Sequence, residues 1–162
     1  MDRAPPVLDE AHAAFVASGV SIVVAGRDAE NLPAVVRAVG CRVSPDRRRV
    51  TVFVPRSQAA EVLDDLQANR EIAAVFCLPS THRTIQLKSR DAALVPIEPG
   101  DAAGIAAQID LFAVDIARLG YEGEFARAVC AHAPDDLVGI AFTPYAAFAQ
   151  TPGPRAGEPL AA

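Results

Sequence analysis

Short runs of β-branched and aromatic residues, separated by turn signals, dominate the first two thirds of the chain. Such runs predict strands at residues 20–25, 33–43, 48–54, 72–78 and 84–95, and a last strand at 136–145. Turn residues such as Ser44-Pro45-Asp46 separate them. Because the first three strands follow one another through short loops, we expect them to form an antiparallel meander.

Helical periodicity appears at residues 9–18, 57–69, 101–119 and 122–131. Ser57 can cap the second helix, and Gly120 can end the third. Apolar residues recur at helical spacing along the third helix, at Ile105, Ile109, Phe112, Ile116 and Leu119. This stripe must be covered by the rest of the chain or by a partner. From residue 150, the Pro- and Gly-rich tail predicts an ordered arm or a flexible end.

The order of these elements predicts a mainly β fold with added helices. Neither a repeated βαβ unit nor an internal repeat is visible, so an antiparallel barrel is favoured over a doubly wound sheet. We expect one domain spanning residues 1–162. Its barrel core takes residues 12–99 plus the strand at 136–145, with a helical segment at 101–131 and an irregular tail at 150–162.

Composition indicates a soluble protein: 51% of its 162 residues are hydrophobic and 22% are charged, and no apolar run approaches the roughly 18 residues of a membrane span. The apolar stretch 11–26 follows Asp9 and Glu10 rather than a basic cluster, which favours a helix leading into a strand over a signal peptide. The three cysteines are odd in number and far apart, so we expect small buried side chains in a reducing, cytoplasmic protein, without a disulfide framework or a zinc site.

Charge is distributed unevenly. The net charge of −5 disfavours nucleic acid as a partner. Residues 27–90 nevertheless hold eleven Arg and Lys against seven Asp and Glu, a local +4, and the remainder holds four against thirteen, a local −9. The basic half suits a small anionic ligand, although Arg47, Arg48 and Arg49 can also form a solvated hairpin tip.

Common enzyme motifs, including Gly-x-Gly-x-x-Gly, the Walker loop, Gly-x-Ser-x-Gly and His-Glu-x-x-His, are absent, and the three isolated histidines do not predict a metal site. A candidate anion site is spread over several elements. Its members are a guanidinium, a hydroxyl or an amide beside a predicted strand or helix end: Arg37, Arg42, Ser57, Gln58, Arg83 and Thr84.

Strand parity limits this site. Arg37 and Arg42 are five residues apart, so in a regular strand their side chains point to opposite faces. Gly40 lies between them and permits a bulge that would bring both to one face. Without the bulge, one of the two arginines serves another subunit or solvent.

Several segments, in this order, resemble the pyridoxamine 5'-phosphate oxidase-like, FMN-binding split-barrel family over residues 12–96. They are Arg-Ala-Val-Gly-Cys-Arg at 37–42, Val-Thr-Val-Phe-Val-Pro-Arg-Ser-Gln at 50–58, Gln-Ala-Asn at 67–69, Ile-Ala-Ala-Val-Phe at 72–76 and Thr-His-Arg-Thr-Ile-Gln-Leu-Lys at 81–88. The tail at 150–157 is similar to that of a bacterial subgroup.

The resemblance implies a six-stranded antiparallel split barrel and a homodimer with FMN at its interface. It implies that Arg37 and Arg42 contact the FMN phosphate, that Ser57 lies in a phosphate-binding segment, and that Thr84 lies near the flavin ring. Gln86 is an alternative ring contact, because it is two residues along the same strand face.

Departures from the family pattern leave the function open. Gln58 and Ala59 stand where a phosphate-binding cation commonly follows Ser57, and Ser89 replaces a common glycine. A lost charge-assisted contact would cost about 1.5–3 kcal/mol unless Arg56 replaces it. The chain is therefore expected to be a flavin-dependent oxidoreductase of unknown substrate, a non-catalytic flavin- or haem-binding or sensing protein, or a structural dimer with a decayed site.

Overall fold

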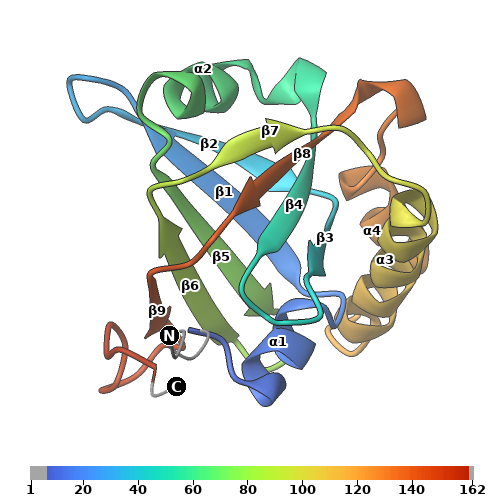
Figure 1. Cartoon of the computed structure of the whole chain (residues 1–162). Coiled ribbons are helices and arrows are strands. Elements are labelled where there is room, and N and C mark those ends of the chain that lie inside the picture. Colours follow the sequence, from blue (N-terminus) through green and yellow to red (C-terminus); the bar gives the residue numbers. More distant parts are fainter. Residues whose placement is uncertain (1–6, 161–162) are drawn as a thin grey trace.

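Two antiparallel sheets face each other across one core (Figure 1). The computed structural model describes residues 7–160, and within them the strand orders are β2-β1-β5-β6-β9 and β3-β4-β8-β7. The strands are β1 (Ser21–Arg27), β2 (Pro33–Ala38), β3 (Gly40–Val43), β4 (Val50–Pro55), β5 (Ile72–Leu78), β6 (Arg83–Ser89), β7 (Ala93–Val95), β8 (Leu137–Phe142) and β9 (Ala146–Ala149). The prediction of a mainly β fold with added helices is confirmed.

The predicted count of six strands is wrong, for a reason visible in the connections. The strand expected at 33–43 bends at Val39 and becomes β2 in one sheet and β3 in the other. The strand expected at 84–95 likewise divides into β6 and β7, and β9 follows β8 beyond the expected end at residue 145. The described strands thus form two sheets rather than one closed barrel, and the chain passes from one sheet to the other four times, between β2 and β3, β4 and β5, β6 and β7, and β8 and β9.

Side chains that alternate inward along the strands fill the space between the sheets. In β1 every second residue is buried, and β5 and β6 show the same alternation. The largest fully buried side chains include Phe76, Leu87, Ile140 and Phe142. Burying a side chain of this size stabilises the fold by about 1.5–3 kcal/mol.

Helices close the two ends and one side of this barrel (Figure 1). They are α1 (Glu10–Val16), α2 (Ala60–Asn69), α3 (Asp101–Ala117) and α4 (Gly123–Val129), with 3-10 turns at Arg56–Gln58 and Pro134–Asp136. Asp9 caps α1 by accepting a hydrogen bond from the N–H of His12 at 2.7 Å. Within residues 7–160, no helix combines the length and apolarity needed to cross a membrane.

The apolar stripe of α3 is covered within the chain. Ile105, Phe112 and Ile116 are buried in a second cluster with Phe53 of β4 and Ala126 of α4, whereas Leu119 is 46% exposed. The helix also lies close to Gly19, where a Cβ atom would fall 2.4 Å from Cβ of Leu111. The stripe therefore needs no second subunit, and it no longer supports a dimer.

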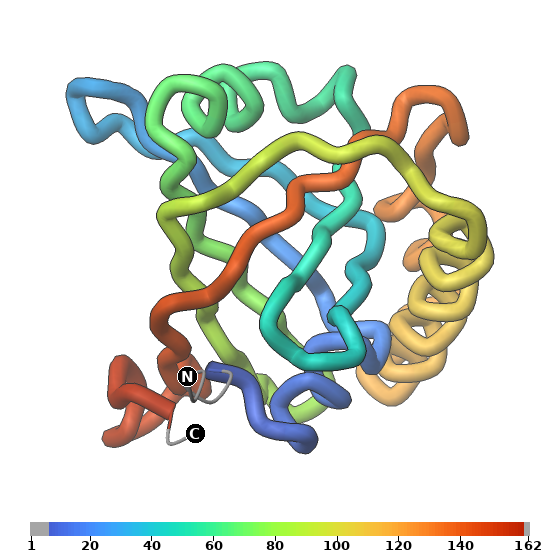
Figure 2. Tube along the Cα trace, in the orientation of Figure 1, coloured from blue at the N-terminus to red at the C-terminus, as the bar shows by residue number. Residues whose placement is uncertain are grey.

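The C-terminal segment is an ordered arm that folds back along β9 (Figure 2). Ala149 donates its N–H to the carbonyl of Glu158 at 2.9 Å, and Leu160 donates to the carbonyl of Ala147 at 2.9 Å. Gln150 also donates its N–H to the carbonyl of Thr84 at 2.8 Å. Of the two predictions for the tail, the arm is thus confirmed for the described residues, and it covers an edge of the five-stranded sheet.

Candidate functional site

The outward-pointing side chains of the five-stranded sheet form a broad surface, called here the outer face. Its floor consists of small or β-branched, half-buried residues of β1 and β5, namely Ser21, Val23, Ala25, Ala73, Val75 and Cys77. In Figure 1 the described helices lie above, below and beside the barrel, and none crosses the sheet over β5 and β6. The outer face is therefore a largely apolar surface that no described helix covers over β5 and β6.

Strand register places polar side chains at both sides of this floor. Val23 pairs with Arg37 on one side and with Val75 on the other, and Val75 pairs in turn with Gln86. The next row across the sheet is Ser21, Cys77 and Thr84. Three strand spacings of about 4.8 Å put Arg37 roughly 14 Å from Gln86. Of the predicted site residues, Arg37, Thr84 and Gln86 thus share one face.

Each of these three residues also contacts the surrounding chain. Arg37 donates through Nη1 to Oγ of Ser21 at 2.7 Å, and it lines a cavity of only about 10 Å³ beside α3 and α4. The N–H of Thr84 donates to Oγ1 of Thr151 at 3.0 Å. Gln86 accepts a hydrogen bond at 3.4 Å from the amide of Gln150, and its own amide nitrogen has no partner among residues 7–160. That nitrogen is available to donate to a ligand.

Arg42 lies in the other sheet and has different partners. The bend at Val39 places it on β3, where Nη1 contacts Oε2 of Glu98 at 2.7 Å and Oδ1 of Asp101 at 2.8 Å. The carboxylate of Asp101 is buried. The break between β2 and β3 therefore separates Arg37 from Arg42, and two carboxylates already neutralise Arg42.

Ser57 and Gln58 lie in the 3-10 turn before α2. The prediction that Ser57 caps this helix is wrong, because the N-cap is Ala59 and no side chain caps the helix there. Both the N–H and the hydroxyl of Ser57 donate to Asp136, at 2.9 and 2.5 Å. Gln58 is exposed. A carboxylate thus holds the donors that were expected to bind a phosphate.

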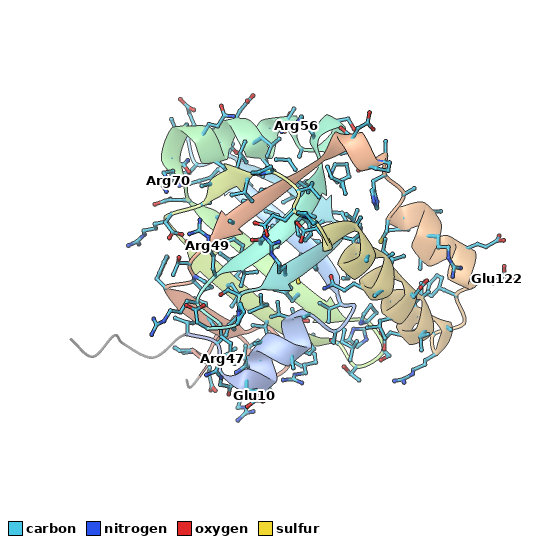
Figure 3. All side chains as sticks on the ribbon, turned by 45° about the vertical axis from the view of Figure 1, so that its right-hand side comes forward. Glu10, Arg47, Arg49, Arg56, Arg70 and Glu122 are labelled. Carbon is cyan, nitrogen blue, oxygen red and sulfur yellow. The ribbon has the colours of Figure 1, made fainter. Side chains whose placement is uncertain are left out.

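Arg83 also contacts another part of the chain. Its guanidinium carbon lies 4.3 Å from the centroid of the Phe15 ring, a cation–π contact between the start of β6 and α1. The predicted anion cluster is therefore dispersed over four parts of the molecule. Other cations of the basic half are dispersed too: of those labelled in Figure 3, Arg56 and Arg70 lie at the two ends of α2, and Arg47 and Arg49 lie between β3 and β4.

A different set of cations meets at the α2 end of the outer face. Arg27, Lys88 and Arg90, with Glu71 and Tyr145, line a cavity of about 280 Å³, called here the cationic groove. Arg27 contacts Glu71 at 2.6 Å and Arg90 contacts it at 3.9 Å. Lys88 lies on the same strand face as Thr84 and Gln86, so strand parity could have indicated it. The approach of Arg27 depends on the pairing of β1, β5 and β6, which the sequence does not reveal.

The cysteines differ in their surroundings. Cys41 and Cys130 are buried as predicted, whereas Cys77 is half-buried on the outer face. Burial raises the pKa of the Cys41 thiol to about 12. Burial also raises the pKa of the Cys130 thiol, and the positive charge of Arg37 partly offsets that increase. No group of three or more His, Cys, Asp or Glu side chains within residues 7–160 could hold a metal ion.

Comparison with known proteins identifies the fold. No protein-family model and no curated protein matches the sequence. HupZ from Group A Streptococcus is similar in structure, with a TM-score of 0.56 and 13% identity over 93% of this chain and 100% of HupZ. A candidate pyridoxamine 5'-phosphate oxidase from Lactobacillus delbrueckii has a TM-score of 0.54 and 13% identity, over 87% of this chain and 93% of that one.

A structure named F420 reductase is also similar, with a TM-score of 0.53 and 14% identity over 86% of this chain and 98% of that one. At such low identity the similarity concerns the fold alone. The fold is thus shared with proteins whose sequences are only 13–14% identical to this one. This chain therefore has the split-barrel fold of the pyridoxamine 5'-phosphate oxidase-like proteins.

Proposed function

We propose that this protein binds a flavin nucleotide, FMN, on the outer face of its five-stranded sheet. The observation that carries the proposal is the half-buried floor of Val23, Val75 and Cys77 between Arg37 on one side and Thr84 and Gln86 on the other. A planar aromatic ring can lie on such a floor, and ligand pockets combine apolar walls with a few polar groups in this way. The free amide nitrogen of Gln86 suits a carbonyl oxygen of the ring.

The proposal includes a second copy of the chain over the outer face. Helices of this chain leave the floor open over β5 and β6, and a two-fold dimer would place the same surface of a partner against it. A ring between two such floors would be shielded from water. The homodimer and the cytoplasmic location both remain predictions.

Bound flavin would supply the electron or hydride transfer, and the protein would orient it and exclude water. The floor residues and the groups that flank them, Arg37, Thr84 and Gln86, include no histidine, aspartate or glutamate. The carboxylate at the α2 end of the outer face, Glu71, is paired with Arg27 at 2.6 Å, so the described residues place no unpaired general acid or base of that kind beside the proposed ring. We therefore propose a flavin-dependent oxidoreductase whose substrate is undefined. The same absence favours a non-catalytic flavin-binding protein as the second candidate.

Haem is a poorer fit to this face. Haem iron is commonly held by an axial histidine. His12 lies in α1 beside Asp9, His82 lies in the β5–β6 turn, and His132 follows α4, so none of the three belongs to the strands that form the floor.

Absorption spectroscopy tests the proposed function. The purified protein should show flavin bands, or should bind added FMN at micromolar concentration; F420 is titrated in parallel because one similar structure is named F420 reductase. A protein that binds neither FMN nor F420 would be assigned the third expected role, that of a structural dimer with a decayed cofactor site.

Arg37→Ala should weaken FMN binding by about ten- to hundredfold if the guanidinium contacts the flavin. Arg56→Ala is the matched control, because Arg56 is exposed in the 3-10 turn before α2. Equal affinity of Arg37→Ala and wild-type protein would place the flavin away from β2.

A further inference from the structure

The cationic groove contains the only lysine of the chain. All the other fourteen cationic side chains are arginines, and Lys88 lies between Arg27 and Arg90 at the α2 end of the outer face. Lys88 forms no ion pair with the residues that the structure describes; its ammonium lies 5.4 Å from the centroid of the Phe148 ring. Its charge is therefore not cancelled by a carboxylate.

The groove has a net positive charge. Three cations face one carboxylate, Glu71, and the closest contact of that carboxylate is with Arg27. The guanidinium of Arg90 lies 4.7 Å from the centroid of the Tyr145 ring. Aromatic contacts thus brace Lys88 and Arg90 while their hydrogen-bond donors stay available.

Volume separates this groove from the predicted phosphate site. The space beside Arg37 is about 10 Å³, enough for one water molecule at most, whereas the groove holds about 280 Å³. Arg42 and Ser57 already bind Asp101 and Asp136. Among these residues of the basic half, the groove alone combines uncancelled charge with room for a dianion.

Position links the groove to the proposed flavin site. Lys88, Gln86 and Thr84 alternate along the outward side of β6, so four residues, or about 13 Å, separate the two ends of this line. A ring beside Thr84 and Gln86 would direct a chain of sugar carbons along β6 toward Lys88.

We propose that the cationic groove binds a phosphate group, and that this group is the phosphate of the flavin nucleotide. The second part rests on the proposed function. Lys88 and Arg90 supply charge-assisted donors to the phosphate oxygens, and Glu71 limits the affinity because it repels the same anion.

Riboflavin lacks the phosphate of FMN, so the ratio of the two binding affinities measures the contribution of the phosphate contact. In wild-type protein FMN should bind more tightly than riboflavin. Lys88→Gln should reduce that ratio by about ten- to hundredfold, whereas Glu71→Gln should increase it. Arg56→Gln, outside the groove, should leave the ratio unchanged. A wild-type ratio near one, or a ratio that Lys88→Gln does not alter, would overturn the assignment of the flavin phosphate.

The single lysine gives a second measurement that does not need flavin. Acetylation of Lys88 by an amine-reactive reagent, followed by mass spectrometry, should slow when inorganic phosphate is added, while acetylation of the N-terminal amine in the same sample reports general effects. If neither flavin binds but phosphate protects Lys88, the proposed function fails and the anion site stands. If phosphate at millimolar concentration does not protect Lys88 selectively, the anion site is overturned.

Discussion

At the scale of single residues, Gln108 shows how a side chain can complete a sheet. β3 is an edge strand, and Gln108 of α3 binds both backbone groups of Cys41: its Oε1 accepts from the N–H at 2.8 Å, and its Nε2 donates to the carbonyl at 2.7 Å. These are the bonds that a neighbouring strand would make. The amide therefore satisfies an exposed edge and fixes α3 against it.

Gln108→Ala should lower the free energy of unfolding by about 1–3 kcal/mol, because it leaves the N–H and the carbonyl of Cys41 without their partner. Urea unfolding followed by circular dichroism measures the loss. Gln67→Ala is the control, since Gln67 is an exposed residue of α2 and its replacement should stay within about 0.5 kcal/mol. Equal effects of the two substitutions would contradict the role given to Gln108.

Cys41 should resist alkylation in the folded protein. Burial raises its pKa to about 12, so at pH 8 the thiolate that reacts is scarce, and raising the pH to 9 should still leave the reaction slow. In denaturant the thiol regains its ordinary pKa, and the reaction should accelerate. Iodoacetamide labelling with peptide mass spectrometry compares the two states; rapid labelling of Cys41 in the folded state would show that its surroundings are open.

The sequence predicted part of the candidate site, but which side chains contact one another depends on the three-dimensional structure. Thr84 and Gln86 could be placed together from strand parity alone. The neutralisation of Arg42 by Asp101 depends on how the start of α3 meets β3, and these residues are 59 apart in sequence. A sequence can identify cations, but it cannot show which carboxylates reach them.

At the scale of elements, the positions of helices and short strands were predictable, but the transfer of a strand between sheets was not. The strand at 72–78 has the predicted bounds, because its β-branched and aromatic run lies wholly in one sheet. The run at 33–43 has continuous strand character, yet its halves join different sheets at Val39. β9 was missed because Ala-Ala-Phe-Ala contains no β-branched residue.

Glycines distinguish the face of α3 that packs from the face that is exposed. Gly19→Ala should lower the free energy of unfolding by more than about 1 kcal/mol, because Gly19 has a φ of 80° and its Cβ would fall 2.8 Å from the carbonyl oxygen of Gln108. Gly104→Ala should instead stabilise the protein by about 0.5–1 kcal/mol, because Gly104 lies within α3 and a Cβ there meets no atom within 4 Å.

Thermal and urea unfolding of both variants measure these opposite effects. Destabilisation by Gly104→Ala would mean that this side of α3 contacts something other than solvent. An unchanged stability of Gly19→Ala would mean that α3 can move away from β1 without cost.

At the scale of the whole molecule, two surfaces compete as interfaces. The outer face offers a half-buried floor centred on Val75, and α3 with its following loop offers Leu111, Val114 and Tyr121, which are 50%, 61% and 50% exposed. We prefer the outer face as the dimer interface, because polar side chains flank its floor and the cationic groove adjoins it. The surface at α3 lacks a comparable groove of cations among the residues that line its neighbouring cavity.

Val75→Glu should convert the proposed dimer to a monomer and abolish FMN binding. An unpaired carboxylate buried at an interface costs about 2–5 kcal/mol or more, and two-fold symmetry places one in each subunit. Sedimentation velocity measures the mass, and alkylation of the neighbouring Cys77 should become faster as the face opens. Val114→Glu should leave the dimer intact; dissociation by Val114→Glu alone would move the interface to α3.

The passage of chain between the sheets has a consequence for how the molecule comes apart. β2 continues into β3 through Val39, β6 continues into β7, and β8 continues into β9. In each of these three pairs, one strand belongs to the five-stranded sheet and the other belongs to the four-stranded sheet. Loosening one sheet pulls on backbone that the other holds in register. The two sheets are therefore not independent units, and both should unfold together in a single cooperative step.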